Sequence, residues 1–177
     1  MNVIRSLLFY LGYFLAILVC GGLFLPVAPL MRLPTRYRLL NLYNHFITAW
    51  FRWTCGVSYR VSGREHLPEG PCVILANHQC EWETIYLQIL KPPVCTVLKQ
   101  ELLRIPLFGW GLRLLHPIAL DRSKPARAMR QVLSQGVQRL NEGLSVLIFP
   151  EGTRVAPGER RRYNKSGTVI ACRAGVP

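Results

Sequence analysis

Residues 72–83 read CVILANHQCEWE, and three structural signals follow one another in this segment. The apolar run 72–76 is typical of a buried strand, and the polar residues 77–80 mark a turn. Helical periodicity begins at Glu81, and the acidic side chains of its first turn suit the helix dipole. A strand, a short turn and a helix in this order are the building unit of an α/β fold.

The same alternation continues along the rest of the chain. We expect further strands at 57–61, 94–98, 117–120 and 145–149, and helices at 81–91, 125–141 and 169–173. The segment 102–115 is amphipathic but is interrupted by Pro106 and Gly109. The sequence therefore predicts an α/β domain with a mixed, substantially parallel sheet flanked by helices.

The residues before this domain have a different character. Residues 6–31 carry no charge, and Leu7–Leu25 is apolar over about the length that crosses a bilayer. Because its glycines and prolines could bend it, the segment is compatible with a helix that spans the membrane and with one that enters and returns on the same side. A cleaved signal peptide is a third alternative. The next segment, Pro34–Cys55, has helical periodicity and carries aromatic residues favoured at a membrane interface: Tyr37, Tyr43, Trp50 and Trp53. We therefore divide the chain into a membrane-embedded helical anchor with an interfacial helix (1–56) and an α/β domain (57–177).

The composition narrows the class of partner. The chain of 177 residues has 22 Lys and Arg against 9 Asp and Glu, a net charge of +13, and is 50% hydrophobic. Such a charge suits nucleic acid or anionic lipid, and the hydrophobicity favours lipid. No nucleic-acid-binding module is recognisable, so we expect no nucleic-acid partner. The six cysteines form no CxxC pair and the four histidines lack ligand spacing, so we expect free thiols and no metal site.

The turn after the first buried strand contains a candidate catalytic pair. His78 and Glu83 can meet only if His78 lies in the turn and Glu83 lies in the first turns of the following helix. A carboxylate bound to one imidazole nitrogen fixes the tautomer, and the other nitrogen can then take a proton from a hydroxyl. The simpler alternative is a hydrogen-bonded histidine in a turn.

Three further strand ends carry candidate substrate-binding residues. In Phe149–Arg154, FPEGTR, Gly152 allows close approach of the backbone and Arg154 offers a planar fork for phosphate oxygens. Glu151 could order that arginine; the alternative is a turn with a surface salt bridge. Arg122 would be a second phosphate ligand, and Lys99 faces either the site or solvent.

Taken together, these segments resemble the motifs of the glycerolipid acyltransferase family, and within it the lysophosphatidate acyltransferases. Residues 77–83 resemble the NHxxxxD block, with Glu83 in place of the usual aspartate. Residues 99–102 resemble the KxEL segment, Asp121-Arg122 resembles the second block, and 149–154 is an unaltered FPEGTR block. The resemblance covers residues 60–177 and a short anchor before them. The family's next block, an apolar segment led by Val-Pro, would start at the end of this chain, so we expect a C-terminal truncation.

The resemblance implies transfer of a fatty acyl group from a thioester to the free hydroxyl of lysophosphatidate, which forms phosphatidate in phospholipid synthesis. It implies the following roles: His78 and Glu83 catalytic; Arg122, Glu151, Gly152, Thr153 and Arg154 substrate-binding; Asn77 and Lys99 further candidates. No bound cofactor is expected. The acyl donor would be acyl-CoA or acyl-acyl-carrier protein, which makes the carrier protein a candidate partner. The expected location is a bacterial inner membrane with the domain on the cytoplasmic face, which agrees with the arginines that follow the apolar segment.

Two other functions stay open at this point. The acceptor could be another lyso-lipid, such as a lyso-ornithine lipid or a lysophospholipid. A non-catalytic membrane protein could instead bind anionic lipid through the arginines between Arg122 and Arg173. For an enzyme, Cys80 offers a covalent acyl-cysteine route, although direct attack suffices because a thioester is already activated.

Overall fold

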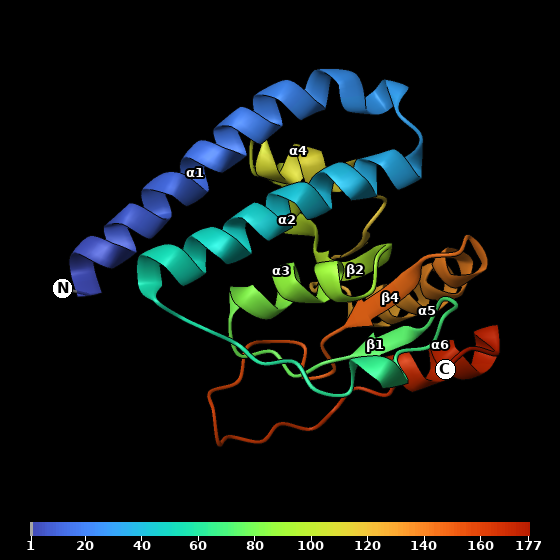
Figure 1. Ribbon diagram of the computed structural model, residues 1–177. Helices are drawn as coiled ribbons and strands as arrows, with labels where there is room; N and C mark the ends of the chain where they lie inside the picture. The colour runs from blue at the N-terminus through green and yellow to red at the C-terminus, as the bar shows by residue number, and fades with distance from the viewer. Residues whose placement is uncertain (1) are drawn as a thin grey trace.

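A helical hairpin and an α/β domain make up the computed structural model, which describes residues 2–177 (Figure 1). The hairpin consists of α1 (Asn2–Val27), the short 3-10 helix η1 (Ala28–Leu30) and α2 (Leu33–Cys55). The domain consists of η2 (Arg64–His66), β1 (Val73–Leu75), α3 (Glu81–Leu90), β2 (Val94–Lys99), η3 (Gln100–Arg104), α4 (Phe108–Arg113), β3 (Ile118–Leu120), α5 (Pro125–Asn141), β4 (Ser145–Ile148) and α6 (Ser166–Ala174).

The four strands form one sheet in the order β1-β4-β2-β3, and all three pairings are parallel. Val146 of β4 lies opposite Val73 on one side and opposite Cys95 on the other. The predicted α/β class with a substantially parallel sheet is therefore confirmed. Because the strands run in one direction, their carboxyl ends lie along a single edge of the sheet.

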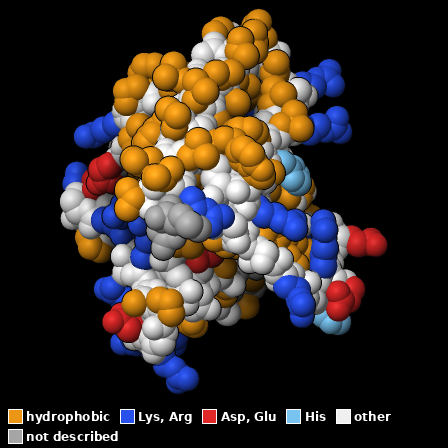
Figure 2. Space-filling model, turned by 60° about the vertical axis from the view of Figure 1, so that its left-hand side comes forward, with side chains coloured by type: hydrophobic (Ala, Val, Ile, Leu, Met, Phe, Trp, Pro, Cys, Tyr) orange, Lys and Arg blue, Asp and Glu red, His pale blue; other side chains and the backbone are white. Residues whose placement is uncertain are grey.

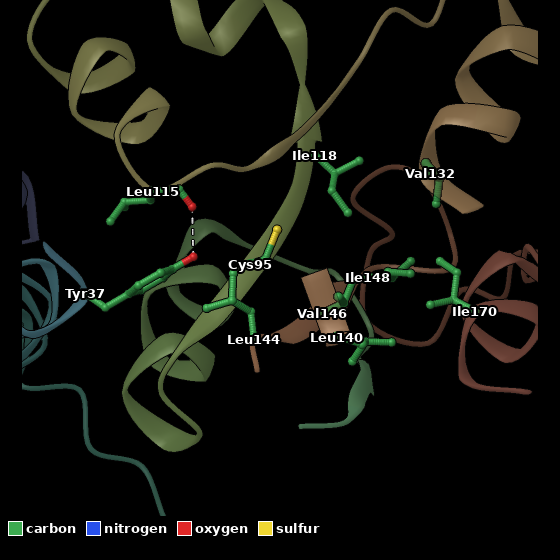
Figure 3. Close-up of a cluster of buried hydrophobic side chains, with 10 residues drawn as sticks. All are labelled: Tyr37, Cys95, Leu115, Ile118, Val132, Leu140, Leu144, Val146, Ile148 and Ile170. Atoms are coloured by element: carbon green, nitrogen blue, oxygen red, sulfur yellow. Dashed lines mark hydrogen bonds between the residues drawn. The ribbon is translucent and has the colours of Figure 1, made fainter. Parts of the chain in front are cut away.

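Helices cover both faces of this sheet, as its continuous apolar strands require. Tyr37 of α2 packs on one side of the core, and Val132 and Leu140 of α5 with Ile170 of α6 pack on the other (Figure 3). The buried Tyr37 hydroxyl donates a hydrogen bond to the Leu115 carbonyl at 2.9 Å. The hairpin thus contributes to the same hydrophobic core as the domain.

The two hairpin helices lie close together because α1 has a glycine at their contact. A Cβ atom on Gly12 would overlap the Trp50 indole, so a larger residue fits there only if that ring moves. The Trp50 indole donates to the Phe9 carbonyl at 3.2 Å. At the open end of the hairpin, the Arg5 side chain donates to the Thr54 carbonyl at 2.7 Å, near the last turn of α2.

The closed end of the hairpin is attached to the domain by Arg36. Its guanidinium donates to the carbonyls of Met31 at 3.0 Å and of Leu114 at 3.1 Å. The Arg36 guanidinium is therefore engaged with backbone carbonyls of the hairpin turn and of the domain.

The outer surface of α1 is apolar and open. Ile4, Leu11 and Leu23 are each about two-thirds or more exposed, and hydrophobic side chains crowd the upper part of the surface in Figure 2. Residues Val3–Leu30 are long and apolar enough to cross a membrane. The helix is continuous through Gly12, Gly21 and Gly22, and the chain reverses only after Val27. An exposed apolar helix of this kind fits association with a membrane.

Two local predictions are wrong. The segment 57–61 is not among the strands of residues 2–177, and its alternate side chains Val57, Tyr59 and Val61 are 39–47% exposed, so the alternation builds no buried face. The predicted interfacial position of Tyr37 also fails, because this side chain is only 4% exposed and lies in the core.

Candidate active site

Polar residues from all four strand ends meet around one cavity of about 770 Å³ at the carboxyl edge of the sheet. The predicted site residues on its wall are His78, Lys99, Arg122, Gly152, Thr153 and Arg154. The other three do not line the cavity: Glu83 and Glu151 form hydrogen bonds with His78, and Asn77 forms one with Glu151. Four segments that are distant in sequence therefore form one site.

The His78–Glu83 pair has the geometry that the sequence predicts. His78 lies in the turn after β1, Glu83 is the third residue of α3, and His78 Nδ1 is 3.2 Å from Glu83 Oε2. The same carboxylate accepts the backbone N–H of Cys80 at 2.9 Å and so caps the start of α3. Because both ends of the contact are held, the imidazole is oriented with Nδ1 toward the carboxylate. Its Nε2 has no hydrogen-bond partner within residues 2–177.

Phe149, the first residue after β4, supports the imidazole from one face. The two ring centroids are 4.1 Å apart and the planes differ by 22°, which is a stacked arrangement. Phe149 was not among the residues predicted for the site, although its position at the head of the FPEGTR segment was a usable signal. The stack restricts rotation of the His78 ring.

Glu151 holds the backbone of the His78 turn. This carboxylate is only 9% exposed, and it accepts the His78 N–H at 2.6 Å and the Asn77 side-chain amide at 2.8 Å. The Val155 N–H in turn donates to the His78 carbonyl at 2.8 Å. The expectation that Glu151 orders Arg154 is therefore wrong, because its two oxygens are engaged elsewhere.

Arg154 pairs instead with Glu81, the first residue of α3, with 2.5 Å between Nη2 and Oε1. Both side chains are open to solvent, 56% and 69% exposed. Gly152 has a φ of +71°, a left-handed conformation that favours glycine, and it turns the chain so that Thr153 and Arg154 reach the cavity wall.

Two more cations, Lys99 and Arg122, line the same wall, and neither has an ion-pair partner in the described part of the chain. The neighbouring Asp121 is turned toward its own loop, where it accepts hydrogen bonds from Ser123 that lower its pKa. With Arg154, these side chains give the cavity a positive character that suits an anionic ligand.

Cys80 is not suited to act as a nucleophile. Partial burial, together with the nearby Glu83 carboxylate, raises the pKa of its thiol, so the unreactive protonated form prevails at neutral pH. Cys80 also does not contribute to the cavity wall. All six cysteines are free, and residues 2–177 contain no group of three or more side chains placed to hold a metal.

One contact in the site had no signal in the sequence. The Asn77 side-chain amide donates to the Tyr163 hydroxyl at 2.7 Å, which brings the arginine-rich loop 156–165 against the His78 turn. Asn164 and Ser166 of the same region lie on the cavity wall.

Comparison with known proteins gives consistent results. Residues 58–177 match the family described as Acyltransferase. The 1-acyl-sn-glycerol-3-phosphate acyltransferase of Pseudomonas aeruginosa is 44% identical over 98% of this chain and 68% of its own length. The protein of that name from Limnanthes douglasii is 33% identical over 80% of this chain and 50% of its own length. The crystal structure of the 1-acyl-sn-glycerophosphate acyltransferase PlsC from Thermotoga maritima superimposes with a TM-score of 0.80 at 26% identity, over 99% of this chain and 71% of that one.

Proposed function

The chain belongs to the acyltransferase family, and on that premise we propose that it transfers a fatty acyl group from a thioester to the free hydroxyl of lysophosphatidate, forming phosphatidate. The observation that carries this proposal is the position of His78. Its imidazole is held by Glu83 on one side and opens on the other side into the cavity that Arg122 and Arg154 line. A general base and a phosphate-binding surface thus share one cavity.

The chemistry follows from this placement. As the acceptor hydroxyl oxygen attacks the thioester carbonyl carbon, its proton passes to His78 Nε2. The Glu83 carboxylate stabilises the imidazolium that forms, and the tetrahedral intermediate collapses with loss of the thiolate. The thiolate takes the proton back from His78, so an ester and a free thiol are the products and the enzyme is unchanged.

The acceptor is held through its phosphate. The Arg154 guanidinium can bind two phosphate oxygens with its planar fork, and Arg122 and Lys99 add charge from the adjacent strand ends. Thr153 and Gly152 line the wall beside Arg154, where the Thr153 hydroxyl and the Gly152 backbone can contact a phosphate that lies close to the wall. This arrangement favours an acceptor with a phosphate over one without it.

The donor is a thioester of coenzyme A or of acyl-carrier protein, and no bound cofactor takes part in the proposed reaction. Since the thioester is already activated, direct attack needs no covalent enzyme intermediate, in agreement with the raised pKa of Cys80. An acidic carrier protein would be a transient partner of this strongly basic chain.

We further propose that residues 1–56 hold the protein in a bacterial inner membrane, with the α/β domain on the cytoplasmic face. The open apolar surface of α1 and the arginines that follow it support this orientation. Cys172, an exposed thiol of the domain, allows a test. A membrane-impermeant maleimide should label it only after spheroplasts are permeabilised, and labelling of intact spheroplasts would contradict the orientation.

The function itself is tested by acyl transfer in a membrane preparation that lacks the host's own enzyme. Lysophosphatidate, a lysophospholipid with a phosphodiester and a lyso-ornithine lipid are compared as acceptors, each with acyl-CoA and acyl-carrier protein as donors, and His78→Ala serves as the blank. We expect transfer to lysophosphatidate. Transfer to the other acceptors alone would identify a different lyso-lipid acyltransferase, and binding of anionic vesicles without any transfer would identify a lipid-binding protein.

A further inference from the structure

Three carboxylates surround the His78 turn, and one of them differs from the others in its partners. Glu83 and Glu151 each accept backbone N–H groups of the turn and are held in place. Glu81 instead forms an ion pair with Arg154, the arginine proposed to bind the acceptor phosphate. This guanidinium is therefore already paired with an anion of the protein itself.

The exposure of this pair indicates that it exchanges easily. Side chains that are 56% and 69% exposed form ion pairs of small net stability, because water competes for both charges. A phosphate monoester carries about −1.5 to −2 charges at neutral pH and can bind an arginine through two oxygens. A phosphate that enters the cavity is thus a stronger partner for Arg154 than Glu81 is.

We infer that Glu81 is an exchangeable counter-ion for Arg154: it pairs with the guanidinium, yields it to the acceptor phosphate, and takes it back as the product leaves. This inference rests on the proposed function. Phosphatidate carries the same phosphate monoester as lysophosphatidate, so the competition weakens binding of acceptor and product alike. Glu81 acts through Arg154 as a positioning residue and limits retention of the product.

The test compares the KM for lysophosphatidate and the inhibition constant of phosphatidate in the full chain and its variants. Glu81→Gln removes the charge and keeps the shape, and we expect both constants to fall by about two- to five-fold without a rise in kcat. Glu81→Asp keeps the charge and should stay near wild type. Glu159→Gln is the matched control, since it makes the same charge change in the exposed loop 156–165 and should leave both constants unchanged.

A double-mutant cycle identifies the partner. In an Arg154→Ala background, Glu81→Gln should have no more effect than the Glu159 control, because the competed group is gone. An unchanged or higher KM in Glu81→Gln, or an effect that persists without Arg154, would overturn the inference. Glu81→Ala should lower the same two constants. It serves as a second variant in case Glu81→Gln does not fold. Failure of the wild-type chain to acylate lysophosphatidate would instead overturn the proposed function, and the two failures are distinguishable.

Discussion

The backbone N–H of His78 donates a hydrogen bond to the Glu151 carboxylate at 2.6 Å, although 73 residues separate them. The same carboxylate also accepts the Asn77 side chain, and it is only 9% exposed. The FPEGTR segment therefore holds the turn that carries the proposed general base, His78, while Arg154 of the same segment lines the cavity proposed to bind the substrate. Through Glu151, the FPEGTR segment and the His78 turn are thus held in a fixed position relative to each other.

Replacing Glu151 by glutamine should loosen the His78 turn. The amide group that replaces one oxygen would face an N–H or NH₂ donor, so at least one charge-assisted hydrogen bond is lost. We expect the free energy of unfolding to fall by about 1.5–3 kcal/mol and kcat to fall while the KM for lysophosphatidate changes little. Chemical denaturation and steady-state kinetics check this. A large rise in KM with unchanged kcat would indicate that Glu151 binds substrate directly.

His78→Ala should remove nearly all turnover, by about 10²–10⁴-fold, because general-base catalysis is worth this much. Binding of lysophosphatidate should survive, since the imidazole is not assigned to the phosphate. Rapid-quench assays and lipid binding by the inactive variant separate the two effects. Wild-type acyl transfer by His78→Ala would contradict the mechanism.

Replacing Glu83, the carboxylate that contacts His78, should lower both kcat and the melting temperature. Glu83→Gln keeps an acceptor for the imidazole N–H but loses the charge that stabilises imidazolium, so its kcat should fall less than that of His78→Ala. Because Glu83 also caps α3 through the Cys80 N–H, the melting temperature should fall as well. Glu83→Asp keeps the charge on a shorter side chain, and we expect a partial loss of kcat.

Arg154→Ala should raise the KM for lysophosphatidate by the equivalent of about 1.5–3 kcal/mol, since a charge-assisted contact with the phosphate is lost. Arg154→Lys should restore only part of the affinity, because a point charge lacks the planar fork. Arg160→Ala, which makes the same charge change in the exposed loop, is the control. An unchanged kcat/KM in Arg154→Ala would show that the phosphate binds elsewhere.

Cys80→Ser should retain acyl transfer, because the protonated thiol takes no part in direct attack. Burial, with the Glu83 carboxylate adding to it, raises the pKa of the Cys80 thiol. Alkylation of Cys80 by iodoacetamide at about pH 8 should therefore be slower in the folded protein than in urea, and should speed up as the pH rises. Peptide mass spectrometry measures both rates, and an acyl thioester trapped on Cys80 would point to a covalent route instead.

Tyr37→Phe should weaken the attachment of the hairpin to the domain. The Leu115 carbonyl loses its buried donor, at a cost of about 1–3 kcal/mol in unfolding free energy near neutral pH. Burial raises the pKa of Tyr37 above its usual 10.0, so the folded protein holds this proton more tightly than the unfolded chain does. Its contribution is thus present below about pH 10 and is lost as the pH rises further, and the difference between wild type and Tyr37→Phe should narrow there. Denaturation at several alkaline pH values measures it, and a constant difference would argue against this account.

Local patterns predicted much of the fold. The helix Pro125–Asn141 has the predicted bounds, and the strands at 94–99, 118–120 and 145–148 fall within a residue of their predicted bounds. Each of these elements is recognisable because its own periodicity and its own terminal residues define it. The segment 57–61 alternates equally well but forms no strand, because a strand also needs a neighbouring strand and a buried face, which its own residues do not specify.

The sequence by itself determined the class of fold, the residues at the strand ends and the His78–Glu83 contact, because the turn and helix that form this contact are contiguous. Only the tertiary structure decided which carboxylate pairs with which partner. Glu151 accepts the His78 backbone N–H, and Glu81 pairs with Arg154. Proximity in sequence had instead suggested that Glu151 pairs with Arg154. Both partners lie 73 residues from their carboxylates. Their contacts arise from the order β1-β4 in the sheet, which brings the two strand ends side by side.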